Sequence, residues 1–263
     1  MTLLNINPNI FGDNIGAVAQ WDFSEANISD ATRVQVVTQV ASICYGDNPK
    51  TIGSEHLYDK LAAESLGLPS SAFEFVPVLY PLAYFGTPTL ADIMSMHVFK
   101  YGTLVGDYLL TNLRAVIHDG LDVAHYNTLA ECAIIKQHTR FYRAEVDLNT
   151  RSQLVRHRSG SFQELSRRYV GERVPFEFYV PDNMPLQAIV KHAYQKQAQL
   201  YRLLISNKVP KEAARRVLPQ AMYTEIWFGW IGLSGFENFI KLRTDQHAQI
   251  EIRTMAKQIQ EWG

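Results

Sequence analysis

The stretch RHRSGSFQELSRRY at residues 156–169 holds five side chains that can carry positive charge: Arg156, His157, Arg158, Arg167 and Arg168. Like charges this close together repel one another unless water or anions separate them. Guanidinium groups bind phosphate oxygens in a forked geometry, and each such hydrogen bond contributes about 1.5–3 kcal/mol where water is partly excluded. The run therefore has two explanations: a solvated basic surface, which is the common one, or a cradle for an anionic nucleotide.

The same stretch has the pattern of a helix N-terminus. Ser161 followed three residues later by Glu164 has the form of a capping box and predicts a helix over 162–169. Free backbone N–H groups and the helix dipole at such an end favour a bound phosphate. Glu164 lies one turn before Arg168 and is expected to orient it, or to accept a hydrogen bond from a base or a ribose. These features favour the nucleotide cradle over the solvated surface.

The elements that position this stretch are predicted from hydrophobic periodicity and turn residues. Helices are expected over 31–44, from Ser54 through Leu66, within 105–120 and 126–138, over 151–158 behind the capping pattern of Thr150 and Gln153, over 186–206 and 211–217, and from near Asp245. Strands are expected over 139–148, where Tyr142, Ala144 and Val146 alternate with charged residues, and over 174–181. No linker is long or polar enough to mark a domain boundary. We therefore expect one α+β domain over 1–263, with a mixed or antiparallel sheet and flanking helices.

Charge and composition limit the classes of function. The 263 residues include 25 Lys and Arg against 26 Asp and Glu, a formal net charge of −1, so no global field attracts a nucleic-acid backbone or an anionic membrane. No stretch has the pattern of an export signal or the length of a membrane-spanning helix. Cys44 and Cys132 are far apart and lack metal-type spacing, which argues against disulfides and a zinc site. We expect a cytoplasmic protein with no metal, no nucleic-acid partner and no membrane span.

The order and spacing of these residues resemble those of flavin-dependent thymidylate synthases. Arg156-His157-Arg158, seven intervening residues and then Ser166 reproduce the RHR-x7-S motif of that family. The surrounding block RSQLVRHRSGSFQELSRRYV is similar to the family throughout, and the resemblance continues through PFEFYVP, KEAARRVLP and NFIKLRTDQHAQIE downstream and ASICYGD upstream. It covers roughly 140 to 260 and part of the first helix.

The resemblance implies an enzyme that converts dUMP to dTMP. In this family the methylene comes from methylenetetrahydrofolate and the reducing equivalents come from NADPH through bound FAD, in a homotetramer whose active sites draw on several subunits. By position, the FAD contacts are Arg156, His157, Arg158, Glu164, Gly232, Ser234 and Asn238. The contacts to dUMP are Gln153, Arg156, Glu164, Ser166, Arg167, Arg168, Arg215 and Arg243.

Arg243 resembles the arginine that favours ionisation of the uracil ring at N3, and it is our candidate catalytic residue. Uracil C5 is a poor nucleophile until negative charge builds up in the ring. A guanidinium that cannot lose its proton stabilises that charge without acting as an acid. This chemistry requires no catalytic cysteine, so Cys44 and Cys132 are interpreted as small buried residues.

The chain departs from the family pattern in two places. Family members carry an Asn-x-Arg element shortly before the segment matched by ENFIKLR, and this chain has Gly232-Leu233-Ser234 there. His138 in KQHTRFY matches an upstream family histidine, which implies an insertion covering about 68–115 with no assigned function. Such an insertion could cap the folate entrance or enlarge a subunit interface.

Two alternative functions differ in class from this enzyme. The missing Asn-x-Arg element is consistent with a non-catalytic flavin- or nucleotide-binding homologue. A nucleic-acid-binding module is disfavoured by the near-neutral net charge and by the lack of interleaved basic and aromatic patches. The aromatic residues Trp227, Phe228 and Trp230 are interpreted as core or subunit contacts rather than as a stacking platform for bases.

Overall fold

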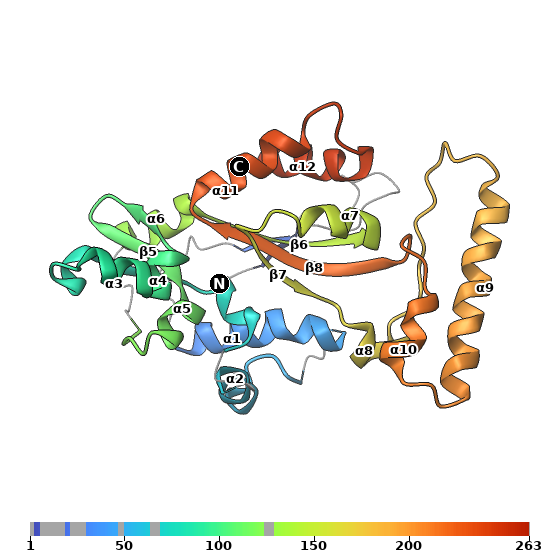
Figure 1. Ribbon diagram of the computed structural model, residues 1–263, viewed down its shortest axis with the longest axis horizontal. Coiled ribbons are helices and arrows are strands. Elements are labelled where there is room, and N and C mark those ends of the chain that lie inside the picture. The colour runs from blue at the N-terminus through green and yellow to red at the C-terminus, as the bar shows by residue number, and fades with distance from the viewer. Residues whose placement is uncertain are drawn as a thin grey trace.

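The computed structural model describes residues 3–5, 19–21, 30–46, 50–63, 69–123 and 129–262. Its centre is a five-stranded antiparallel sheet in the order β1-β2-β6-β8-β7 (Figure 1). The strands are β1 (Leu3–Asn5), β2 (Ala19–Trp21), β6 (Thr139–Asp147), β7 (Ser161–Glu164) and β8 (Tyr223–Ile231). Helices flank the sheet, so the predicted α+β fold with an antiparallel sheet is confirmed.

The pair β6 and β8 forms the spine of the sheet, and its two faces bury different side chains. Tyr142, Ala144 and Val146 of β6 lie in one core, as their alternation predicted. Phe141 points to the opposite core, as does Trp227 of β8. Both faces are therefore buried, and the interpretation of Trp227, Phe228 and Trp230 as core residues is confirmed, since each is at most 1% exposed.

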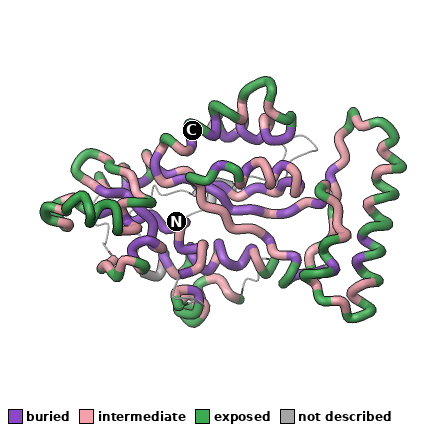
Figure 2. The backbone as a smooth tube through the Cα atoms, viewed as in Figure 1, coloured by how far each residue is buried: buried purple, intermediate pink, exposed green. Residues whose placement is uncertain are grey.

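Helices lie on both faces of the sheet. On one side, α1 (Asp30–Ser42) continues into the short helix η2 (Ile43–Tyr45), and α2 (Glu55–Ala62) packs on α1. On the other side lie α7 (Leu148–Leu154), α11 (Leu233–Arg243) and α12 (Ile250–Trp262) (Figure 1). The remaining elements are α6 (Leu129–His138), α8 (Arg167–Val170), η5 (Gly171–Arg173), α9 (Gln187–Ser206), α10 (Lys211–Ala214) and η6 (Arg215–Val217). Helix α9 packs on α10 and η6 and is exposed along most of its length (Figure 2).

Residues 69–123, which include most of the predicted insertion, form a second antiparallel sheet in the order β3-β5-β4. Its elements are η3 (Ser71–Phe75), β3 (Pro77–Pro81), η4 (Leu82–Phe85), α3 (Leu90–Ser95), α4 (His97–Lys100), β4 (Thr103–Val105), β5 (Tyr108–Asn112) and α5 (Leu113–His118). The prediction of a helix within 105–120 is wrong for the first half of that range, which contains strand β5. Leu109, Leu110 and Thr111 are all buried because β5 is the central strand, and Asn112 then caps α5.

The structure contradicts both of the capping boxes that were predicted around the RHR motif. Asp147, not Thr150, is the N-cap of α7, because its side chain accepts a hydrogen bond from the backbone N–H of Thr150 at 3.0 Å. The helix also ends earlier than predicted, at Leu154, before the motif begins. Residues 161–164 are strand β7, paired with β8, rather than the start of a helix over 162–169. Long-range pairing with β8 overrides the local polar pattern there.

The structure also departs from the predicted bounds of three further elements. The expected strand over 174–181 is a single bridge between Phe178 and Met222. Helix α2 begins after its N-cap Ser54 as expected but ends at Ala62, and residues 64–68 lie outside the described part of the chain. The last helix begins at Ile250 rather than near Asp245. The described part of the chain has no helix both long and apolar enough to cross a membrane.

The core around Phe75 ties the second sheet to the first, because its ring lies 5.3 Å from that of Phe141 and 6.5 Å from that of Trp227. Phe75 is 0% exposed, so Phe75→Ala is expected to lower the free energy of unfolding by about 3–5 kcal/mol. Leu90→Ala, at a residue 73% exposed, is expected to change it by less than about 0.5 kcal/mol. Urea unfolding measures both. Equal effects of the two variants would contradict this packing.

Candidate active site

Helix α11 ends at Arg243, whose side chain reaches the loop that follows α7. Its Nε–H donates to Nε2 of His157 at 2.8 Å, and Nη2 donates to the backbone carbonyl of Gln153 at 3.0 Å. A guanidinium carries five N–H donors. Among the residues that the structure describes, Nη1 of Arg243 has no hydrogen-bond partner. The side chain is thus held from one side and has donors left for a ligand.

His157 is a neutral acceptor for this arginine. It is 7% exposed, and its ring packs edge-on against that of Phe239 at 5.1 Å. Burial, and secondly the charge of Arg243, lower the pKa of His157 to about 4. Because Nε2 accepts a hydrogen bond, the ring proton lies on Nδ1. The imidazole therefore orients the guanidinium without taking a proton near neutral pH.

The loop that carries the RHR motif turns so that its middle residue points inward and its arginines point outward. The N–H of His157 donates to the carbonyl of Leu154 at 3.1 Å, and the N–H of Gly160 donates to the carbonyl of His157 at 2.9 Å. Arg156 and Arg158 are exposed. Burial lowers the pKa of Arg243, and the charge of Arg156 lowers it further. Two guanidinium groups this close favour an anion beside them.

A cavity of about 670 Å³ lies where the second sheet meets the RHR loop. Three of the predicted flavin contacts line it: Arg158 from the loop, and Gly232 and Ser234 from the start of α11. Gly232 has φ 84°, and a Cβ there would lie 3.1 Å from Cβ of Thr103, so the chain passes close to the second sheet at this point. The cavity therefore lies between the family motif and the predicted insertion.

Glu164 is fixed by neighbours other than the one expected. Nε of Arg151 donates to Oε2 at 2.7 Å, and Oγ1 of Thr224 donates to Oε1 at 3.2 Å. Arg168 instead lies over the ring of Tyr169 at 4.7 Å. The expectation that Glu164 orients Arg168 one helical turn later was wrong, because residues 161–164 are a strand.

Arg167 is 6% exposed and is bound to the backbone around it. It donates to the carbonyls of Gly171, Val174 and Pro175 at 2.6–3.1 Å. Its guanidinium also lies over the ring of Phe176 at 4.9 Å. In this chain Arg167 holds the turn after α8.

Three other predicted dUMP contacts lie around that same turn: Ser166, Arg168 and Arg215. Ser166 precedes α8, and the side chains of Arg168 and Arg215 are exposed. Helix α8 packs on α10, at the end of the molecule away from α11 (Figure 1). One chain therefore divides the predicted residues into two groups, one around Arg243 and the cavity and one around α8 and α10. Asn238 is exposed on α11.

The two cysteines are free and differ in their surroundings. Cys132 is 7% exposed, which confirms its interpretation as a buried residue. Cys44 is only half-buried and has polar partners, which corrects the interpretation of this residue as a buried apolar one. Its Sγ–H donates to the carbonyl of Glu164 at 3.2 Å, and Sγ accepts from Nε2 of Gln163 at 3.0 Å.

Sequence reasoning missed the contribution of residues 69–123 to this cavity. Lys100, Asn112 and Arg114 line the same cavity as Gly232 and Ser234. Two of them are cations, placed on short apolar elements, but no motif marks them. The fold of residues 69–123, rather than a sequence motif, brings these residues to the cavity.

The low pKa of His157 predicts how stability depends on pH. Its folded-state pKa of about 4 lies below its unfolded value, so between these values the unfolded chain binds more protons. The free energy of unfolding should therefore fall as pH falls from about 6.5 towards 4. The His157→Gln variant should show a smaller fall, while His192→Gln, at an exposed position on α9, should match the parent chain. Identical slopes for the parent chain and His157→Gln would show that His157 protonates freely in the folded state.

Curated proteins of similar sequence share one name. The chain is 38% identical over 118 residues to the flavin-dependent thymidylate synthase of Pseudothermotoga lettingae, over 40% of this chain and 52% of that protein. It is 36% identical over 137 residues to that of Aquifex aeolicus, over 44% of this chain and 43% of that protein. It is 27% identical over 189 residues to that of Mycobacterium avium, over 65% and 73%. The chain thus spans about half the length of the first two relatives.

A solved structure aligns with part of this chain, and a family profile matches most of it. A UMP/dUMP methylase from Streptomyces cacaoi, bound with 5-Br UMP, aligns with a TM-score of 0.43 and 26% identity, over 47% of this chain and 67% of that chain. The profile described as "Thymidylate synthase complementing protein" matches residues 28–262. Because this match spans most of the 263 residues, the chain belongs to the thymidylate synthase complementing protein family.

Proposed function

We propose that the protein is a flavin-dependent thymidylate synthase, which reductively methylates dUMP to dTMP. It takes the methylene from methylenetetrahydrofolate and the reducing equivalents from NADPH through bound FAD. The observation that carries the proposal is Arg243, a cation held by the neutral His157 of the RHR motif, in a member of this family. The names of the relatives support the flavin and the thymidylate product.

Arg243 supplies the charge that the chemistry requires. Its guanidinium stays protonated near neutral pH, so it stabilises negative charge on the uracil ring without donating a proton to it. His157 and the carbonyl of Gln153 take two of its hydrogen bonds and fix its direction. Because these partners are part of the folded chain, the cation needs no rearrangement when charge develops. Arg156 adds a second positive charge beside it.

The residues of the cavity fit a flavin nucleotide. A volume of about 670 Å³ lies within the range of small-molecule and cofactor sites. Arg158 and Lys100 bring positive charge to the walls, which suits phosphate groups, while Arg114 is paired there with Glu74. Gly232 and Gly235 have no side chains, so the backbone itself borders the cavity at these positions. When bound there, FAD supplies the hydride transfer, and the walls around it orient it and limit access of water.

The division of the predicted residues between two ends of the chain supports shared active sites in a homotetramer. Arg168 and Arg215 at α8 and α10 would then meet Arg243 of another copy. Helix α9 beside them carries exposed apolar side chains, among them Ile189 and Leu203, with 64% and 58% of their surface exposed. Exposed apolar side chains of this kind favour a subunit contact.

A non-catalytic flavin- or nucleotide-binding homologue is the second candidate. Gly232-Leu233-Ser234 replaces the family's Asn-x-Arg element, and Gly232 and Ser234 line the cavity. Ser234 therefore stands where the family has an arginine, and it offers the cavity only a small hydroxyl group.

Activity distinguishes the two candidates. The purified protein is expected to be yellow and to bleach with NADPH. With methylenetetrahydrofolate and NADPH present, it should release tritium from dUMP labelled at C5, because methylation at C5 displaces that hydrogen. Flavin-loaded protein that bleaches but releases no tritium would establish the non-catalytic homologue and exclude the synthase.

The role of Arg243 is tested by comparing turnover with flavin content. Arg243→Ala should lower kcat by about 100-fold or more, as loss of a charge-stabilising donor does, while bound flavin per chain changes little. Arg253→Ala is the matched control, because Arg253 also donates to a backbone carbonyl, that of Gln246, and has no proposed role in the site. Equal loss of turnover and of flavin in Arg243→Ala would mean that Arg243 holds the cofactor instead.

A further inference from the structure

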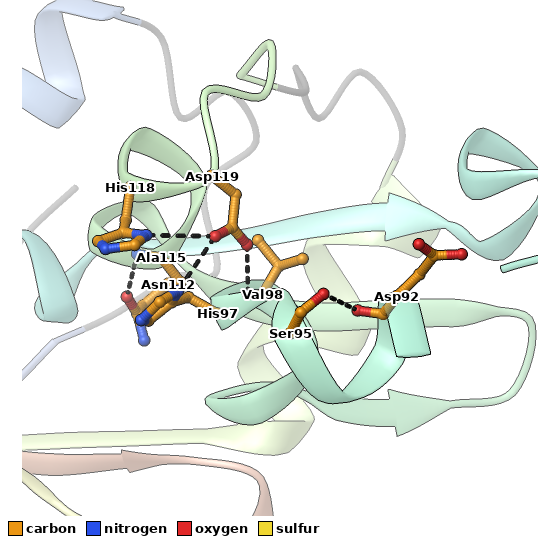
Figure 3. A network of polar contacts seen from close by, with 8 residues as sticks. All are labelled: Asp92, Ser95, His97, Val98, Asn112, Ala115, His118 and Asp119. Carbon is orange, nitrogen blue, oxygen red and sulfur yellow. Dashed lines mark hydrogen bonds and ion pairs between the residues drawn. The ribbon is translucent and has the colours of Figure 1, made fainter. Parts of the chain in front are cut away.

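Two histidines and an aspartate converge at the edge of the cavity, in the segment without an assigned function. His97 begins α4, and His118 and Asp119 lie at the end of α5. Figure 3 shows both imidazoles directed towards the carboxylate of Asp119. Nδ1 of His97 lies 3.2 Å from Oδ1 of Asp119, and Nδ1 of His118 lies 3.3 Å from the same oxygen. The candidate ligand atoms of the three residues all lie within 4.8 Å of one another.

These separations match those between the ligands of a tetrahedral metal ion. In a zinc site, bonds of about 2.0–2.2 Å place neighbouring ligand atoms about 3.3 Å apart. The rings of His97 and His118 have centroids only 3.5 Å apart, so two protonated imidazoles would repel each other there. A shared cation between Nδ1 of each ring and Oδ1 removes that repulsion. The three groups therefore have donor types that Zn²⁺ prefers, and the two nitrogen-to-oxygen separations fit a zinc site.

A backbone hydrogen bond orients the carboxylate of Asp119. The backbone N–H of Val98 donates to Oδ2 of Asp119 at 2.9 Å, which leaves Oδ1 for the two rings (Figure 3). Such an outer hydrogen bond to a ligating carboxylate is a regular feature of metal sites.

Cations in the cavity wall nearby have partners of their own. Arg114 is paired with Glu74, and Nζ of Lys100 lies over the ring of Tyr101 at 5.2 Å. The charge of Arg114 is thus partly balanced by Glu74, which lowers the cost of placing a further cation nearby.

We propose that His97, His118 and Asp119 bind a divalent transition-metal ion of the zinc class. Both histidines line the cavity, so the proposed site lies at its edge. The ion ties α4 to the end of α5 and braces this wall of the cavity. This site departs from the expectation of no metal, which was based on the spacing of the two cysteines. The proposal does not depend on the proposed function.

The competing explanation is a hydrogen-bonded cluster without a metal, in which both Nδ1–H groups donate to Oδ1 of Asp119. The test uses the full chain without a polyhistidine tag, stripped of metal with a chelator and free of added dUMP and folate. Calorimetric titration with Zn²⁺ should give one ion per chain. Titration with Co²⁺ should give the visible absorption of a tetrahedral ion.

His118→Asn and Asp119→Asn are the test variants, and His192→Asn on α9 is the control, because His192 is an exposed histidine outside the cluster. Loss of an outer partner weakens metal binding 10–100-fold, so loss of a ligand should weaken it by at least about 100-fold. Asp119→Asn keeps an acceptor for Val98, and its unfolding without metal should stay close to that of the parent chain. Absence of Zn²⁺ binding by the parent chain, or equal affinity in all variants, would overturn the proposal.

Discussion

The hydrogen bond from Nε of Arg243 to Nε2 of His157 is the interaction on which the site depends. It requires an imidazole without a proton on Nε2, and burial beside a cation provides that state. The burial comes from the core on one face of the sheet, where Phe239 contacts both His157 and Trp230. The direction of a partly exposed cation is therefore set by apolar packing behind it.

The same two strands hold both walls of the cavity. One face of β6 and β8 carries α11, and the start of that helix brings Gly232 and Ser234 to the space. The other face packs against Phe75, which anchors the segment that supplies Lys100 and Arg114. A region predicted as an insertion is thus part of the main core. Its position against the RHR loop makes the cavity a property of the whole chain rather than of the motif.

Sequence patterns were reliable where a regular period of apolar residues runs along a whole element. The alternation of Tyr142, Ala144 and Val146 predicted β6, and the long periodic helix over 186–206 is α9. The pattern at Ser161 and Glu164 failed because two polar residues cannot specify a helix against pairing with β8.

The candidate site was predictable only in part. The motif and the family resemblance identified Arg243 and His157, but not the bond between them, since 86 positions separate the two residues. The wall that carries His97 and Arg114 has no motif, so only the three-dimensional pairing of its strands could reveal it. The most direct measurement of the central claim is the ultraviolet difference spectrum of dUMP bound to the flavin-loaded protein, followed across pH. We predict that bound uracil loses its N3 proton at a lower pH than free dUMP, and that Arg243→Ala abolishes this shift; the same ionisation pH for bound and free dUMP in the parent chain would contradict the account.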